Sequence, residues 1–145
     1  MHPLAILASL GAITAWGSAA IFDKIAMAHF KSAWVAVTIR MGLAWAIVAG
    51  ISFASGGLRE AVSVPRYAII ALLVSGLLGS LIGQVSYYAA VKYAEVSRVV
   101  GITSAYPLVT FLLGTLLLRE SVTPVKLAGV LLSVAGITLL TLPSK

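Results

Sequence analysis

The residues of this sequence that could take part in chemistry are few, and most are polar groups inside long hydrophobic segments. Arg40 lies about two helical turns inside the segment 33–54, where an unpaired charge costs at least a few kcal/mol in a membrane. Its side chain either extends back to the polar boundary near Lys31 or lines a cavity and binds a carboxylate or phosphate. The other candidates for substrate contact are Trp16, Gln84, Tyr87, Tyr88, Ser104 and Tyr106.

These other candidates have alternative roles as well. Trp16 falls near the middle of its hydrophobic segment, whereas an aromatic belt places tryptophan at the membrane boundary. Its position favours a cavity wall, although contact with lipid fits too. Gln84, Tyr87 and Tyr88 lie near one end of another segment, where contact with a substrate and hydrogen bonding between helices are both plausible interpretations.

Several other kinds of chemistry lack the residues they need. The sequence has no cysteine, and its two histidines, His2 and His29, are too scattered for a metal site. No nucleophile stands with a base, so we expect neither an enzyme nor a bound cofactor. The net charge is +6, but the ten Lys and Arg residues form no basic patch, which argues against nucleic acid as a partner.

The composition is that of an integral membrane protein. Of the 145 residues, 61% are hydrophobic and 10% are charged, compared with about 25% charged in an average soluble domain. No basic residue precedes the first hydrophobic segment, as a signal peptide would require. We predict an all-α, multi-pass protein in the lipid bilayer, a single domain over residues 1–145 with five transmembrane helices at 4–22, 33–54, 67–91, 98–118 and 125–142.

The fourth of these segments has a proline at its centre. Pro107 removes one backbone hydrogen bond and pushes on the preceding turn, so it kinks or breaks a helix. Small and polar residues precede it, among them Gly101 and Ser104. In lipid the freed carbonyl needs a partner, so this turn should face protein or water. We interpret Gly101 and Pro107 as a hinge beside a binding cavity; a simple packing kink is the alternative.

Two helices carry faces of small residues that suit close helix packing. Gly76, Gly79 and Gly83 share one face of the third segment. Gly129, Ser133 and Gly136 share one face of the fifth. Each face should meet another helix, in this chain or in a second copy.

The basic residues outside the segments are almost evenly divided between the two sides of the membrane. With Arg40 left aside, four lie on one side and five on the other. The bias that normally sets orientation is therefore nearly absent. A balanced chain could insert both ways and form an inverted pair, the symmetry that many transporters build from internal repeats. The alternative is that the basic residues contribute unequally to orientation, so that a single orientation is fixed.

At this point the sequence resembles the EamA domain of the drug/metabolite transporter superfamily. Trp16-Gly17 followed by Lys24 is similar to the domain's opening, and Arg40 matches the arginine of its second helix. Its C-terminal half is matched in order and spacing by 88–93 (YAAVKY), 104–107 (SAYP), 117–120 (LLRE), Gly129 and Gly136. Each motif is weak alone, but their order covers nearly the whole chain.

The resemblance implies a transporter of small metabolites, amino acids or drugs in the cytoplasmic (inner) membrane. Most relatives carry two such domains in inverted orientation, so it also implies a half-size member that pairs as a homodimer or with a related half-size chain. The four-helix multidrug exporters of this superfamily use a glutamate in their first helix, and here all four acidic residues are predicted at segment ends or in loops: Asp23, Glu60, Glu95 and Glu120.

We therefore expect no buried carboxylate, and Arg40 favours an anionic or zwitterionic substrate. The function that fits best is transport of small metabolites by an inverted dimer that works by alternating access. The alternative is a membrane subunit or scaffold that uses its small-residue faces to bind partner helices without transporting anything.

Overall fold

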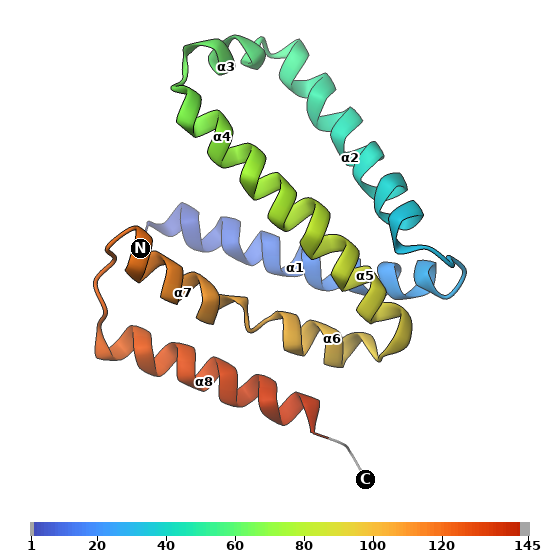
Figure 1. Cartoon of the computed structure of the whole chain (residues 1–145), viewed down its shortest axis with the longest axis vertical. Coiled ribbons are helices and arrows are strands. Elements are labelled where there is room, and N and C mark those ends of the chain that lie inside the picture. Colours follow the sequence, from blue (N-terminus) through green and yellow to red (C-terminus); the bar gives the residue numbers. More distant parts are fainter. Residues whose placement is uncertain (1, 143–145) are drawn as a thin grey trace. The chain divides into compact units, whose positions relative to one another are not determined.

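A computed structural model describes residues 2–142 of the chain, and this part is helical without a strand. In chain order the elements are α1 (Pro3–Met27), α2 (Ala33–Ala54), η1 (Gly57–Arg59), α3 (Glu60–Ser63), α4 (Arg66–Ser75), η2 (Gly76–Gly83), α5 (Gln84–Tyr93), α6 (Val96–Thr103), α7 (Tyr106–Leu117) and α8 (Pro124–Thr141) (Figure 1).

Four helical segments are long and apolar enough to cross a membrane. They are α1, α2, the continuous run Arg66–Tyr93 and the run Val96–Leu117, and α8 contributes a shorter apolar helix. The prediction of an all-α, multi-pass membrane protein is therefore confirmed. By its contacts the chain divides into two compact units, Met1–Tyr93 and Ala94–Lys145. Residues 143–145, including the predicted C-terminal charge at Lys145, lie outside the described part.

Helix starts follow local sequence signals. Pro3 occupies the first turn of α1, where a missing N–H costs nothing, and the Nδ1 atom of His2 accepts a hydrogen bond from the Leu4 N–H at 3.3 Å. At α8 the Thr123 hydroxyl accepts from the Lys126 N–H at 3.2 Å, and Pro124 is the first helical residue. These caps satisfy backbone donors that a helix leaves unpaired at its N-terminus.

Two stretches that the sequence predicts as loops are partly helical. After the first predicted span, 4–22, helix α1 continues to Met27 because no glycine or proline interrupts the sequence there. Asp23 and Lys24 are therefore helical residues and not loop residues. The connection after the second span contains η1 and α3, where we expected only a loop.

The third span contains a π-helical stretch, η2, between the α-helical segments α4 and α5. Long π-helical stretches are rare, because their hydrogen bonds run five residues back instead of four. Gly83 ends this stretch, and a Cβ atom there would lie 3.1 Å from the backbone oxygen of Leu78. A side chain at position 83 would therefore press on the backbone that forms the π-helical turn.

Gly83→Ala is expected to be destabilising even though alanine is the better helix former. Gly50→Ala in α2 is the matched control, because among the described residues no atom beyond the helix's own nearby backbone lies within 4 Å of a Cβ at that position. The control should gain up to about 1 kcal/mol in free energy of unfolding from helix propensity. Gly83→Ala should instead lose stability, because the close contact with the Leu78 backbone outweighs that gain. Unfolding in detergent micelles measures both, and equal stabilisation would show that η2 does not depend on glycine.

The predicted kink at Pro107 is a full break in the helix. Helix α6 ends at Thr103 and α7 begins at Tyr106, with Pro107 in its first turn. The hydroxyl of Ser104 donates to the Val100 carbonyl at 2.7 Å, and that of Thr103 donates to the Val99 carbonyl at 2.9 Å. These bonds supply partners to carbonyls in the last turn of α6. Gly101 lies within α6, before the break.

The second unit consists of α6, α7 and α8, and both α6 and α7 contact α8. Arg119 adopts a left-handed backbone conformation (φ 53°) directly after α7. This lets the Glu120 N–H donate to the Gly114 carbonyl at 3.1 Å, which closes the end of the helix. The Lys126 ammonium lies 3.7 Å from the Glu120 carboxylate on the other side of the turn.

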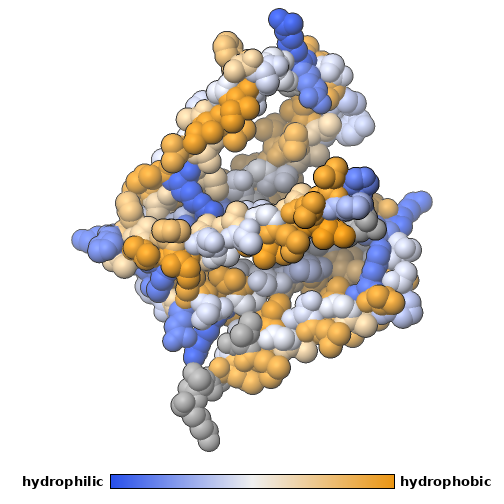
Figure 2. Space-filling model, turned by 180° about the vertical axis from the view of Figure 1, so that it is seen from behind, coloured by the Kyte–Doolittle hydropathy of each residue, from blue (hydrophilic) through white to orange (hydrophobic). Residues whose placement is uncertain are grey.

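Large hydrophobic side chains are exposed along most helices, as Figure 2 shows for one face. Helix α4 and the η2 stretch bury no residue at all. In water such a surface would be unstable, whereas lipid tails cover it at no cost. The exposed surface therefore agrees with a protein whose helices contact lipid or further helices.

Candidate functional site

In the first unit, α1, α2 and α5 meet at one end. The buried residues of these helices lie where the C-terminal part of α1, the N-terminal part of α2 and α5 come together: Ala20, Asp23, Met27, Ala36, Val37, Tyr88 and Val91. Small residues on α1 and α2 allow close approach. One of the seven, Asp23, is charged, and it is the centre of a polar cluster.

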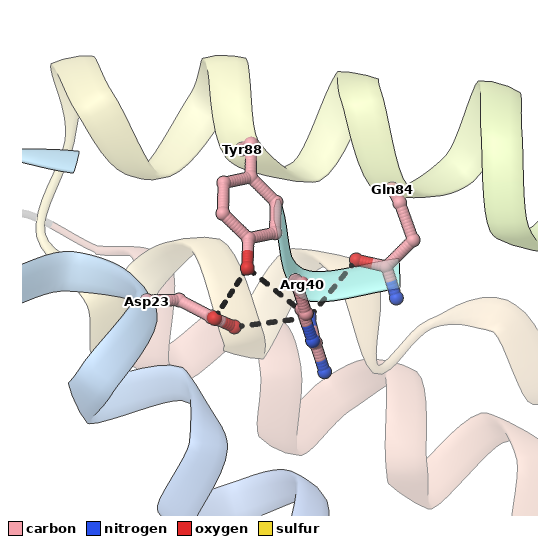
Figure 3. A network of polar contacts seen from close by, with 4 residues as sticks. All are labelled: Asp23, Arg40, Gln84 and Tyr88. Carbon is pink, nitrogen blue, oxygen red and sulfur yellow. Dashed lines mark hydrogen bonds and ion pairs between the residues drawn. The ribbon is translucent and has the colours of Figure 1, made fainter. Parts of the chain in front are cut away.

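The polar cluster consists of Asp23 on α1, Arg40 on α2, and Gln84 and Tyr88 on α5 (Figure 3). The Tyr88 hydroxyl donates to Asp23 Oδ1 at 2.6 Å. Arg40 Nη1 lies 3.3 Å from Asp23 Oδ2, and it also donates to Gln84 Oε1 at 3.2 Å and to Tyr88 Oη at 3.4 Å. Opposite charges thus neutralise each other inside a membrane-spanning unit.

The hydrogen bonds of the cluster differ in strength. The Tyr88–Asp23 bond is short and involves a carboxylate, which makes it a strong one. The three contacts of Arg40 share a single nitrogen and are all at or beyond the usual upper distance of about 3.2 Å. Within the described residues, Nε and Nη2 of Arg40 donate to no protein acceptor. Asp23 is therefore firmly held, while much of the guanidinium is available to another acceptor.

A pocket of about 340 Å³ opens beside this cluster. Ligand sites in proteins commonly measure about 300–1,000 Å³ and combine apolar walls with a few polar groups. This pocket has that character, because aliphatic and aromatic side chains surround one ion pair. It is lined by Ala19, Phe22, Asp23, Ala26, Phe30, Ala36, Ile39, Arg40 and Tyr88.

Lysines at the same end of the unit bond to backbone carbonyls. The Lys24 ammonium donates to the Val91 carbonyl at 2.7 Å, which ties α1 to α5. The Lys92 ammonium donates to the Lys31 carbonyl at 2.6 Å, between the end of α5 and the connection that precedes α2. Both bonds hold in place the helix ends that carry Asp23 and Tyr88.

The structure brings three of the predicted substrate-contact residues together: Arg40, Gln84 and Tyr88. Tyr87 lies next to them, with its ring edge-on to that of Tyr88 at 5.9 Å between centroids. Trp16 is on α1 but is exposed and does not line the pocket. Ser104 and Tyr106 belong to the second unit, where the Ser104 hydroxyl bonds within its own helix end.

Most of the predicted packing glycines have open surroundings within their own units, the exception being Gly83, where a Cβ would meet the Leu78 backbone. Among the described residues of the first unit, no atom beyond the helix's own nearby backbone lies within 4 Å of a Cβ built on Gly76 or Gly79. In the second unit the same holds for Gly129 and Gly136, and the Ser133 hydroxyl bonds to the Gly129 carbonyl at 2.9 Å. These faces are thus available to another helix, which leaves the packing hypothesis as a prediction.

The expectation that no carboxylate is buried is wrong. Only 10% of the Asp23 side chain is exposed, and this residue pairs with Arg40. The sequence predicts a loop at Asp23 because this residue is the first charge after a hydrophobic segment. Its neighbours gave a usable signal, since Ala20, Asp23 and Met27 continue a helical spacing of three and four through the charged residues. The pairing also supplies Arg40 with a third role besides snorkelling and anion binding.

A set of membrane-spanning helices with a paired charge and a pocket in one unit defines a polytopic α-helical membrane protein with a candidate small-molecule site. The chain belongs to the EamA-like transporter family, whose sequence pattern it matches over residues 3–142. The family resemblance predicted from the sequence motifs is therefore confirmed.

Two curated relatives show the same relationship. The chain is 30% identical to a WAT1-related protein of Arabidopsis thaliana over 129 residues, which cover 84% of this chain and 32% of that protein. It is 26% identical to the uncharacterized transporter YvbV of Bacillus subtilis (strain 168) over 143 residues, which cover 98% of this chain and 46% of YvbV. The chain thus spans less than half the length of either relative. No solved structure matches it.

Proposed function

We propose that this chain transports small molecules across the cytoplasmic membrane and that the pocket between α1, α2 and α5 holds the substrate. The observation that carries the proposal is the Asp23–Arg40 pair beside an apolar pocket in a membrane-spanning unit. Ionisable residues at membrane depth are expensive and commonly mark a substrate or ion pathway. Membership of a transporter family supports the same function.

The pocket favours an anionic or zwitterionic substrate with an apolar body, such as an amino-acid-like or drug-like compound. Within the described part of the chain, two nitrogen atoms of Arg40 have no protein acceptor, and they suit the planar fork of a carboxylate. The side chains of Phe22, Phe30 and Ile39 suit a hydrocarbon group. A strongly hydrated substrate would lose more hydration free energy on leaving water than contact with these apolar walls would return.

We propose further that transport proceeds by alternating access in an inverted dimer, formed by two copies or by this chain and a related half-size chain. The open small-residue faces around Gly79 and Gly136 suit contact with a second domain. The near-balance of basic residues, four against five, suits insertion in both orientations.

Flux measurements test transport directly. Liposomes that contain the purified protein are expected to take up at least one compound from a panel of amino acids, organic anions and amphipathic drugs. Arg40→Gln should abolish this uptake, and Pro107→Ala should slow it because the helix break between α6 and α7 would be lost. If both variants transport normally, the pocket and the hinge are wrongly assigned. If nothing is transported and one fixed membrane protein co-purifies instead, the chain is a subunit or scaffold.

Topology tests the inverted dimer, and the cysteine-free sequence makes the experiment simple. Single cysteines at His2 and, in a second variant, at Ser144 (outside the described residues) are labelled on intact cells with a membrane-impermeant thiol reagent. Partial labelling of both variants is the expected result, because each chain would insert in both orientations. Labelling of only one variant would exclude an inverted homodimer and require an oppositely oriented partner chain.

A further inference from the structure

The charges that line the pocket come from two residues of opposite sign. Within the described residues, Asp23 and Arg40 are its charged lining groups, and their nearest atoms are 3.3 Å apart. Lys24 follows Asp23 in sequence but does not line the pocket, and its ammonium bonds to the Val91 carbonyl. The lining of the pocket is therefore electrically balanced.

A ligand of net charge would disturb this balance. An anion that takes Arg40 away from Asp23 leaves the aspartate, 90% of whose side chain is buried, without its cation. A cation that takes Asp23 leaves the guanidinium without its anion. A charge deprived of its partner in a poorly hydrated site is strongly unfavourable. A ligand that carries both charges avoids either loss, because it supplies a new partner to each residue.

The geometry of the cluster suits such an exchange. Tyr88 holds the Asp23 carboxylate through Oδ1 at 2.6 Å, and each carboxylate oxygen accepts more than one hydrogen bond. Arg40 has long contacts through Nη1 alone. A ligand that carries its carboxylate and its ammonium on the same carbon atom has two charges about as close together as those of Asp23 and Arg40. When it binds, positive and negative charges alternate around the four groups.

We propose that Asp23 is a specificity-determining residue which makes the pocket select zwitterions with an apolar body over anions and cations of the same shape. The ligand carboxylate binds Arg40, the ligand ammonium binds Asp23, and the hydrocarbon group contacts Phe22, Phe30 and Ile39. This inference rests on the proposed function, because it names the class of the transported substrate. Arg40 supplies the attraction for a carboxylate, and Asp23 supplies the repulsion that rejects a simple anion.

Three probes that share one hydrocarbon group test the proposal: leucine (zwitterion), 4-methylpentanoate (anion) and 3-methylbutylamine (cation). Equilibrium dialysis with radiolabelled probes measures binding to the full chain in lipid nanodiscs. Leucine is expected to bind at least about tenfold more tightly than either of the others, since a hydrogen bond to a charged group is worth about that factor or more. Equal affinities, or tighter binding of the anion, would overturn the proposal without any need for a variant.

Asp23→Asn tests the residue itself. It should weaken leucine binding about tenfold and tighten binding of 4-methylpentanoate, so that the anion becomes the preferred probe. Glu60→Gln is the matched control, because it removes a carboxylate from the exposed helix α3, outside the pocket, and should leave the preference for leucine unchanged. If Asp23→Asn lowers all three affinities by the same factor, Asp23 is only structural and the proposal fails.

The outcomes also separate this inference from the proposed transport. Selective binding of leucine without uptake by liposomes would retain Asp23 as a selectivity residue and reject transport. Uptake of other compounds with no difference among the three probes would support transport and reject the role of Asp23.

Discussion

Arg40→Gln is expected to reduce the free energy of unfolding by about 3 kcal/mol, because it leaves the buried Asp23 carboxylate without its cation. The value lies at the low end for a broken buried ion pair, since 33% of the Arg40 side chain remains exposed and Tyr88 still donates to Asp23. Chemical unfolding of the protein in detergent micelles measures the loss.

The exposed pair Arg98–Glu95 is the matched control for this experiment. Its nearest atoms are 3.0 Å apart, closer than those of Arg40 and Asp23, but the two side chains are 38% and 71% exposed. Arg98→Gln should therefore cost no more than about 1 kcal/mol. Equal losses for the two arginine variants would show that burial of Asp23 has no energetic consequence.

A double variant distinguishes a lost attraction from an uncompensated charge. Asp23→Asn combined with Arg40→Gln removes both charges, so it should be more stable than Arg40→Gln alone by at least about 1 kcal/mol. If the two single losses simply add, the residues do not interact in the folded protein, and the ion pair does not contribute as described.

Tyr88→Phe is expected to cost about 2 kcal/mol, because it removes a hydrogen bond to a charged, buried acceptor. The aromatic ring remains, so packing of α5 against α1 should be kept. The same variant should weaken leucine binding, since Asp23 would no longer be held in place for the ligand ammonium. Unfolding in micelles and equilibrium dialysis measure the two effects.

Tyr93→Phe on the same helix is the control for Tyr88→Phe. Tyr93 is exposed, and within the described residues its hydroxyl makes no hydrogen bond to a protein atom. Removal of the Tyr93 hydroxyl should change the free energy of unfolding by less than about 0.5 kcal/mol. A Tyr88→Phe protein as stable as the Tyr93→Phe protein would contradict the strength assigned to the Tyr88–Asp23 bond.

The sequence indicated part of the candidate site because polar residues inside hydrophobic segments are unusual. Arg40, Gln84 and Tyr88 were chosen on that ground, and the structure brings them into one cluster. Trp16 is predicted to line a cavity because it lies near the middle of its segment, but it is exposed, because position along a helix does not reveal which side faces protein. Asp23 was missed because its charge marked the end of a span, although the helix continues for another turn.

The sequence by itself determined that this is a helical, multi-pass membrane protein, and its second hydrophobic segment, 33–54, coincides with helix α2. Those features depend on hydrophobic length and on local capping or breaking residues, which are visible along the chain. It also predicted an interruption of the helix near Pro107, and the break lies just before this residue. Local chemistry is sufficient for each of these conclusions.

Only the tertiary structure decided that Asp23 pairs with Arg40 and Tyr88, residues 17 and 65 positions away in the sequence. Such a pairing depends on how far each helix is rotated about its own axis and where it crosses its neighbours, and neither quantity follows from hydrophobic periodicity. The helices of this protein are apolar on nearly every side, so the sequence carries little information about their facing surfaces. Ala20 on α1 and Ala36 on α2 are both buried in the unit that holds these charges, and small side chains allow helices to approach closely.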